Sequence, residues 1–262
     1  MSKIAFFLAC LLFFPHQGYS FNVDSSKTLP VMHEGRVKPL DTVARSTLKS
    51  IYSKESISFK EEKISAIQWL WMMLSSSEQV NDIPIFRIDH PDLIHTLKLS
   101  PKKKVFSQNE ISSQEKTIFS KAKEFEETPS TNLSTFQLSL VHLCEKLQIY
   151  HQLQNTLQFE DSPSAIQEFV YCTKLILAKS LTRQEKEELS MLSSRYEYMS
   201  NFSLFFPLFP LEDSPSWESI GQGVLSLRNN QSVHPAILPY LELIENIKEK
   251  KVENFNNNSL LI

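Results

Sequence analysis

The sequence is poor in glycine and cysteine and has no excess of positive charge. Four glycines occur in 262 residues, and because tight turns and bulges draw on glycine, we expect a mostly helical chain. Three cysteines occur, without a C-x-x-C pair or a C-x-x-C-H motif, which argues against thiol exchange and covalent haem attachment. The formal net charge of −3 lacks the basic footprint of nucleic-acid binding, so nucleic acid is not an expected partner.

The N-terminal residues have the pattern of a targeting signal. Lys3 precedes an apolar run from Ile4 to Phe14, which would rise only about 16 Å as a helix, against the roughly 30 Å of a hydrocarbon core. Gly18 and Ser20 suit the small-residue positions of a cleavage site. We therefore expect residues 1–20 to be a secretory signal peptide, with an uncleaved anchor as the alternative.

Beyond this signal, no stretch reaches the ~18 apolar residues that a membrane-spanning helix needs. Residues 21–253 are expected to form a single mostly helical extracytoplasmic domain, followed by a flexible tail at 254–262. The expected location is the periplasm, either free or peripheral on the outer face of the inner membrane. Cys144 and Cys172 are a possible disulfide in that oxidising compartment; two buried unpaired thiols are the alternative.

Hydrophobic periodicity predicts a multi-helix fold. Capping boxes begin helices at Ser107–Glu110 and Thr182–Glu185. A clean apolar seam runs through 132–158, and the following turn at Pro163 predicts a long antiparallel helical hairpin with the next helix. At most two short extended segments are expected, at 83–89 and 104–106, and no fixed-period repeat is evident. The expected helices cover about 41–52, 60–75, 92–99, 107–127, 132–158, 164–181, 182–199, 214–227 and 234–250.

No set of residues forms a recognisable reaction centre. The pair His33–Glu34 lacks the second histidine of H-E-x-x-H, and His90 and His95 would diverge by about 140° on a helix. The chain contains no G-x-S-x-G elbow, phosphate loop or dinucleotide fingerprint. We therefore predict neither a metal site nor catalytic residues, and we expect the protein not to be an enzyme.

Two aromatic stretches have competing interpretations. Trp69 and Trp71 are expected to be core residues rather than part of a haem site. The run from Phe202 to Phe209 is too apolar to be left in water, so we expect a buried extended crossing of the core. The alternative is a membrane-facing or partner-facing patch, whose candidate residues are Phe202, Phe205, Phe206, Phe209 and Trp217.

Charged residues concentrate around one glycine in V-M-H-E-G-R-V-K-P-L-D-T-V-A-R, residues 31–45. Gly35 permits a positive φ and predicts a turn, Pro39 stiffens the approach, and Asp41 is expected to cap the following helix. The alternative to a binding role is a structural turn whose arginine pairs with an internal carboxylate. The charged side chains of this stretch are expected near a helix N-terminus, a place that favours anions. The candidate partner- or anion-binding residues are His33, Glu34, Arg36, Lys38 and Arg45.

Residues 29–45 resemble a segment of the fused system II cytochrome c biogenesis proteins, in which a haem exporter/cytochrome c synthetase carries a large extracytoplasmic region. The shared pattern is an apolar-Pro-Val, a G-R, a P-L-D-T and an A-R on the next helix. Weaker similarity continues in order at residues 89–93, around Pro210 and Trp217, and in the closing helix. The family's membrane helices, its W-G-x-x-W-x-W-D haem segment and its haem-ligating membrane histidines have no counterpart here.

This resemblance implies a non-enzymatic extracytoplasmic component of c-type cytochrome maturation. Such a component would be membrane-associated and would dock or present haem or apocytochrome c to a membrane-embedded cytochrome c synthetase. Its suspected partners are the synthetase components and apocytochrome c. No cofactor is expected to be bound stably, and haem is expected only within such an assembly. The alternative is an exported helical adaptor or scaffold protein unrelated to haem.

Overall fold

The computed structural model describes residues 23–76, 79–212, 214–229 and 232–249; the expected signal peptide and the tail at 254–262 lie outside them. Helices dominate, which confirms the mostly helical class. They are α2 (Leu40–Tyr52), α3 (Ala66–Leu74), α4 (Pro91–Thr96), α5 (Gln108–Ile111), α6 (Glu115–Lys123), α7 (Thr135–Gln154), α8 (Ala165–Leu177), α9 (Arg183–Phe202), α10 (Ile220–Leu225) and α11 (Ile237–Lys248). Strands are confined to two-stranded antiparallel sheets: β1 (Pro30–His33), β2 (Arg36–Pro39), β3 (Ser56–Phe59), β4 (Glu62–Ser65), β5 (Phe86–Arg87) and β6 (Val105–Phe106).

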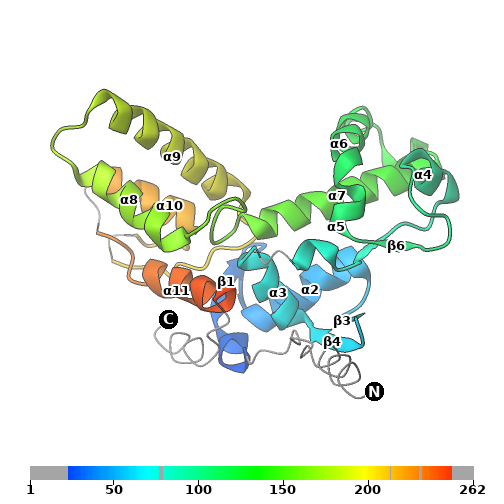
Figure 1. Cartoon of the computed structure of the whole chain (residues 1–262), viewed down its shortest axis with the longest axis horizontal. Coiled ribbons are helices and arrows are strands. Elements are labelled where there is room, and N and C mark those ends of the chain that lie inside the picture. The colour runs from blue at the N-terminus through cyan, green and yellow to red at the C-terminus, as the bar shows by residue number, and fades with distance from the viewer. Residues whose placement is uncertain (1–22, 77–78, 213, 230–231, 250–262) are drawn as a thin grey trace, which may run out of the picture.

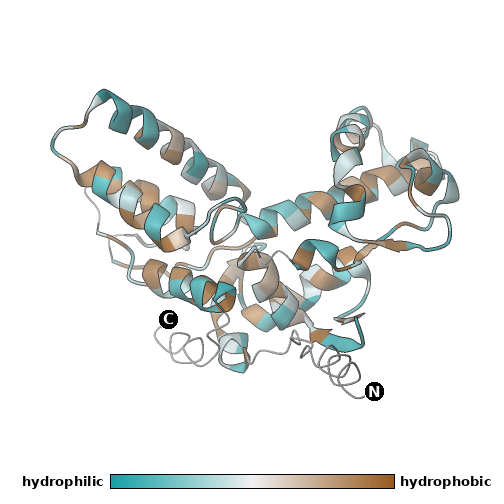
Figure 2. Ribbon diagram, in the orientation of Figure 1, coloured by the Kyte–Doolittle hydropathy of each residue, from teal (hydrophilic) through white to brown (hydrophobic). Residues whose placement is uncertain are grey.

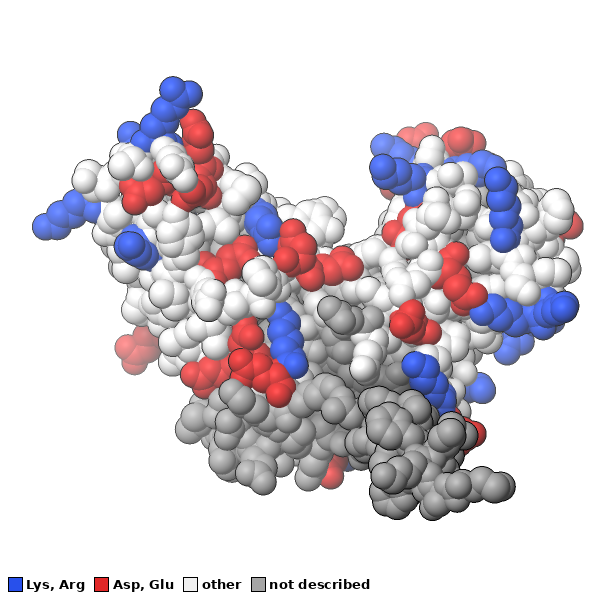
Figure 3. All heavy atoms as spheres, in the orientation of Figure 1, with Lys and Arg blue, Asp and Glu red and all other residues white. Residues whose placement is uncertain are grey.

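The elements form a base and two arms (Figure 1). The strands β1 to β4 and helices α2 and α3 make the base, α7 runs from the centre into one arm with α4 and α6, and α8, α9 and α10 make the other. The space-filling view shows a hollow between the arms, with acidic side chains around it (Figure 3). Buried hydrophobic residues from all three parts nevertheless form one contiguous core. Hydropathy follows this arrangement, since the apolar α3 lies in the base and the more hydrophilic α9 lies outside (Figure 2).

The base is built from one hairpin–helix unit used twice. In the first unit β1 and β2 pair with Pro30 opposite Pro39, and α2 begins at the next residue; in the second, Ser56 lies opposite Ser65 and α3 follows at once. Each position of the second unit therefore lies 26 residues after its counterpart in the first; Ser56, for example, corresponds to Pro30. The expectation of no repeat was wrong, and so was the helix expected from residue 60, because residues 60–65 belong to the second hairpin.

The two units agree in conformation and in burial. The two residues at each turn have positive φ, +53° and +73° at Glu34 and Gly35 and +47° and +67° at Lys60 and Glu61. This pattern matches the twist of two-residue hairpins. The positions that face the core also correspond, and helices α2 and α3 pack on each other. The matching buried pairs are Val31 and Ile57, Leu40 and Ala66, Val43 and Trp69, Ala44 and Leu70, and Leu48 and Leu74.

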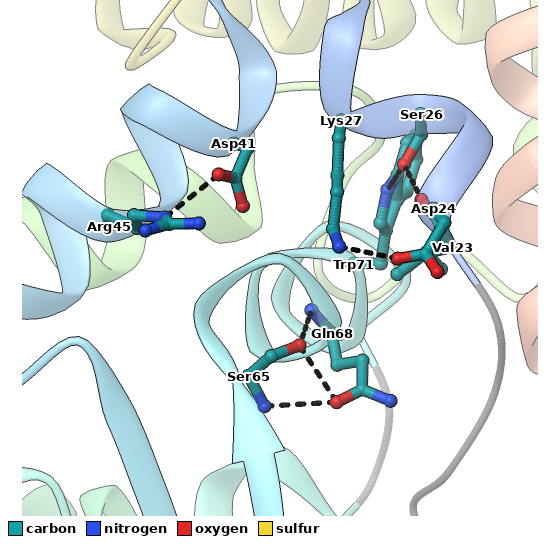
Figure 4. Close-up of polar contacts among 9 residues, drawn as sticks. All are labelled: Val23, Asp24, Ser26, Lys27, Asp41, Arg45, Ser65, Gln68 and Trp71. Carbon is teal, nitrogen blue, oxygen red and sulfur yellow. Dashed lines mark hydrogen bonds and ion pairs between the residues drawn. The ribbon is translucent and has the colours of Figure 1, made fainter.

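Polar side chains fix where the helices begin. Both expected capping boxes are present. Three further boxes use glutamine in place of glutamate: Ser65–Gln68, shown in Figure 4, Ser134–Gln137 and Ser219–Gln222. Each satisfies backbone N–H groups that have no partner inside the helix, a contribution of about 1 kcal/mol per cap.

Trp71 anchors the start of the described chain to α3. Its indole Nε1–H donates to Ser26 Oγ at 2.7 Å, and Ser26 Oγ donates to the Val23 carbonyl at 2.7 Å (Figure 4). Both Trp71 and Trp69 are fully buried. The interpretation of this aromatic pair as core residues is therefore confirmed.

The helical hairpin lies one connection later than expected. Helices α7 and α8 do not run along each other; α8 packs instead against α9, to which a short turn joins it (Figure 1). The reason lies in residues 155–164, which are bonded to α3 and to the extended segment after α9 and do not simply reverse the chain. Gln158 Nε2 donates to the Leu74 carbonyl at 3.0 Å, and Thr156 Oγ1 accepts from the Leu204 N–H at 3.0 Å.

The strand expectations need one correction. The two expected extended segments do pair, as β5 with β6, but the two hairpins of the base exceed the limit of two extended segments. The residues after α9 form a further extended crossing, in which Phe206 bridges to Met32 and Leu208 bridges to Glu218.

This crossing belongs to the core. Phe205 and Leu208 are buried, whereas Phe202 is 46% exposed at the end of α9. Phe206, Phe209 and Trp217 are half-buried. The five aromatic residues therefore do not gather into one exposed patch, and the interpretation of a buried crossing fits all of them except Phe202.

The possible disulfide is not formed, and the alternative of two buried unpaired thiols fits the structure. Cys144 and Cys172 are both free and buried, and they lie on α7 and α8, which do not pack together. Burial raises the pKa of the Cys172 thiol to about 11 and also raises that of Cys144. At neutral pH both thiols are protonated and inert.

Candidate functional site

Hairpin 1, residues 30–39, holds most of the charged residues that the sequence singles out. At its tip, Lys38 Nζ lies 2.7 Å from Glu34 Oε2 and 3.1 Å from His33 Nδ1. Because an ammonium group can only donate, His33 Nδ1 accepts and the ring proton is on Nε2. These three side chains form a closed polar cluster.

The electrostatics of this cluster keep His33 neutral. Burial is the largest cause that lowers its pKa, and the charge of Lys38 lowers it further, against a smaller opposing effect of Glu34. The hydrogen bond from Lys38 and the nearby His33 hold the pKa of Glu34 low. Lys38 and Glu34 therefore compensate each other, and the ammonium group of Lys38 is already engaged rather than free for an external anion.

Asp41 does not cap α2. The helix begins one residue earlier than expected, after Pro39 and without a side-chain cap, because the Leu40 N–H donates to the Leu29 carbonyl at 2.9 Å. Asp41 lies in the first turn and accepts from Arg45 Nε at 2.8 Å (Figure 4). Arg45 is thus engaged in a surface ion pair, of a kind that contributes about 0–1 kcal/mol.

Arg36 differs from the other candidates. Its side chain is exposed next to the turn. In the part of the chain that the structure describes, its guanidinium makes no hydrogen bond or ion pair, although its charge helps to lower the pKa of Glu34. The alternative interpretation, in which the arginine of the turn pairs with an internal carboxylate, describes Arg45 in part but not Arg36.

Val37, which sequence reasoning missed, is also exposed, at 54%. The sequence does place an aliphatic residue between Arg36 and Lys38, and this could have indicated an exposed apolar residue on a short strand. Strand β2 is the outer strand of the sheet, because the other edge of β1 is occupied by backbone hydrogen bonds between Met32 and Phe206 at 2.8 and 2.9 Å. Arg36 and Val37 therefore stand on the strand whose outer edge has no neighbour among the described strands.

The second hairpin shows that these two residues are not needed for the fold. Glu62 and Lys63 occupy the positions of Arg36 and Val37, and the turn, the register and the following helix are the same. Arg36 and Val37 are therefore free to serve a role other than holding the hairpin together.

Metal clusters and membrane-spanning helices are both absent from the described residues. Among them, no three His, Cys, Asp or Glu side chains are grouped closely enough to hold a metal ion. Likewise, none of the described helices is long and apolar enough to cross a bilayer. No protein-family model matches the chain, and a search of curated proteins finds no match either.

Proposed function

We propose that this chain is a non-enzymatic docking component of c-type cytochrome maturation, exported to the outer face of the membrane. In this proposal hairpin 1 contacts a membrane-embedded, haem-handling synthetase. The observation that carries it is the exposure of Arg36 and Val37 on the outer strand of a hairpin whose twin forms without them. The resemblance of residues 29–45 to the extracytoplasmic region of such synthetases supplies the biological setting.

The chemistry of the tip suits a protein contact. A guanidinium group can donate two parallel hydrogen bonds to a carboxylate of a partner or to a haem propionate, and arginine is enriched among residues that dominate interface energies. Val37 adds an apolar contact beside it. The outer edge of β2 can also accept an additional strand from a partner, a common mode of peptide recognition.

Haem ligation is not part of this proposal. His33 is 9% exposed and its Nδ1 is engaged by Lys38, so a haem iron would have to break an internal contact to reach it. In this proposal haem is contacted only through its propionates and only within the assembled complex. Apocytochrome c is the second suspected partner.

The test compares matched positions of the two hairpins. In cells that depend on this chain for cytochrome c maturation, Arg36→Ala and Val37→Ser should each reduce co-purification of the membrane synthetase and lower holocytochrome c. Lys63→Ala, at the counterpart of Val37, should leave both unchanged. Far-ultraviolet circular dichroism of all three variants should match the parent protein.

The outcomes separate the two hypotheses. Normal synthetase co-purification and normal holocytochrome c in the Arg36→Ala and Val37→Ser variants would refute the docking role. Loss of a membrane partner with normal cytochrome levels would instead favour the exported adaptor unrelated to haem.

A further inference from the structure

A groove of about 740 Å³ lies between the loop that follows α7 and one side of α9. The loop contributes Phe159, Glu160 and Asp161, and α9 contributes Met191, Arg195 and Tyr198. A second groove adjoins it, shares Asp161, Met191 and Arg195, and extends to Glu168 and Glu188. None of these residues belongs to hairpin 1.

The wall formed by α9 carries three exposed apolar side chains on an otherwise hydrophilic helix. Met191 is 57% exposed, Tyr198 47% and Phe202 46%. With Arg195 they are spaced by three and four residues, so they lie on one side of the helix. The Tyr198 and Phe202 rings stack with centroids 4.7 Å apart. Three large apolar side chains on one side of a helix, two of them in ring contact, suit a contact surface better than a scattered exposed residue does.

The floor of the groove is acidic. Arg195 lies over the Phe159 ring at 4.3 Å, and its Nη2 donates to Asp161 Oδ1 at 2.6 Å. Its Nε is 3.3 Å from Glu168 Oε1. Two carboxylates thus already compensate the one guanidinium of the lining, and the exposed Glu160 and the half-buried Glu188 add further negative charge.

Helix α9 is held rigidly enough to present this surface. Helix α10 packs behind it so closely that a methyl group at Gly221 would lie 2.6 Å from the Ser200 backbone nitrogen. A preformed surface loses little conformational freedom on binding, which favours affinity.

We propose that this groove binds a cationic segment of a partner protein, one that alternates lysine or arginine with large apolar side chains. The apolar side chains of the partner segment lie on Met191, Tyr198 and Phe202, and its lysine or arginine side chains face Glu160, Asp161 and Glu188. Charge complementarity selects this occupant. An anionic lipid surface would be repelled by the same carboxylates, and a second copy of the chain would bring two acidic linings together. The proposal stands apart from the role of hairpin 1.

Fluorescence anisotropy with the full mature chain tests the proposal. The probe is a short labelled peptide of alternating lysine and leucine, and the two comparison peptides carry glutamate in place of lysine or serine in place of leucine. The first should bind, with affinity that falls as salt rises, and the other two should not.

Variants then locate the site. Tyr198→Ser and Glu160→Lys should each weaken binding of the lysine–leucine peptide, Tyr198→Ser by about tenfold as for a contact residue at the centre of an interface. Leu177→Ser, at a residue 65% exposed on α8 outside the groove, and Glu127→Lys, on the other arm, are the matched controls and should leave the affinity unchanged.

Other results would overturn the inference. Equal affinity for all three peptides, or equal effects of the groove and control variants, would show that binding is not at the groove. Sedimentation with phosphatidylglycerol vesicles that Tyr198→Ser abolishes would assign the face to a membrane. A dimer that the same variant dissociates would assign it to a second copy.

Discussion

The contact between α9 and α10 depends on Gly221 having no side chain. In the structure a Cβ at this position would lie 2.6 Å from the Ser200 backbone nitrogen and 3.1 Å from the Ser200 Cα, and closer still to the Tyr196 carbonyl oxygen. All three are backbone atoms of a helix, so they cannot move aside as the end of a flexible side chain would. Gly221→Ala must therefore push the two helices apart.

The expected magnitude follows from two opposing effects. Overpacking a well-packed contact costs about 1–3 kcal/mol, while replacing glycine by alanine inside a helix gains up to about 1 kcal/mol. We expect a net destabilisation of about 1–2 kcal/mol, which for a chain of this size corresponds to a lowering of Tm by about 2–8 °C. The displaced α9 should also weaken binding of the lysine–leucine peptide.

Urea and thermal unfolding monitored by circular dichroism measure this effect, and Gly35→Ala is the matched control. Gly35 has a φ of +73° but open space around it. Alanine there costs about 1–2 kcal/mol for the left-handed conformation, offset by about 0.4–1 kcal/mol from a less flexible unfolded chain. The control should therefore lower stability by up to about 1.6 kcal/mol, through backbone strain and not through helix packing, and it should leave peptide binding intact. A Gly221→Ala protein as stable as the parent would refute the packing argument.

Two histidines should give pH dependences of opposite sign. The pKa of His33 is lowered below its ordinary value of 6.5. The unfolded chain therefore takes up the proton first, and the parent protein loses stability as pH falls below about 6.5. In urea titrations, the stability of His33→Phe relative to the parent should rise between pH 8 and pH 5.5. Burial lowers the pKa of His151, but the hydrogen bond of its Nε2 to Glu115 Oε2, at 3.2 Å, outweighs burial, so the pKa of His151 is raised overall. The stabilisation of the folded protein by this contact is therefore present below about pH 6.5 and is lost at higher pH. His151→Gln should accordingly cost more stability at pH 6 than at pH 8.5, and a pH-independent difference in either variant would contradict the assigned contacts.

The sequence predicts those local structures whose residues carry a chemical signal. Gly35 predicted the first turn, and Ser107–Glu110 and Thr182–Glu185 predicted two helix starts. The second turn was missed because Lys60 and Glu61 adopt positive φ without the Asn-Gly or Asp-Gly pair that normally marks such turns. A serine three residues before a glutamine, as at Ser65, would have placed the start of α3 correctly.

The remaining errors arise from contacts between residues distant in sequence. Asp41 has the right chemistry for a cap, yet the Leu29 carbonyl already accepts from the Leu40 N–H and the helix starts earlier. The hydrogen bond between Gln158 and the Leu74 carbonyl directs the chain away from α7. No local sequence pattern indicates this bond. At the candidate site, sequence named the charged residues correctly as a group, but only the coordinates separate the self-compensated cluster around Lys38 from the exposed Arg36.

The doubled unit of the base also bears on the order of folding. Each copy closes through contacts within a short stretch, from residue 30 to residue 52 in the first, and such local contacts form early because little loop entropy opposes them. Two of the three tryptophans, Trp69 and Trp71, lie in α3 of the second copy. In a Trp217→Phe protein, stopped-flow fluorescence during refolding would thus follow the packing around α3, and peptide binding would show when α9 has reached its native position.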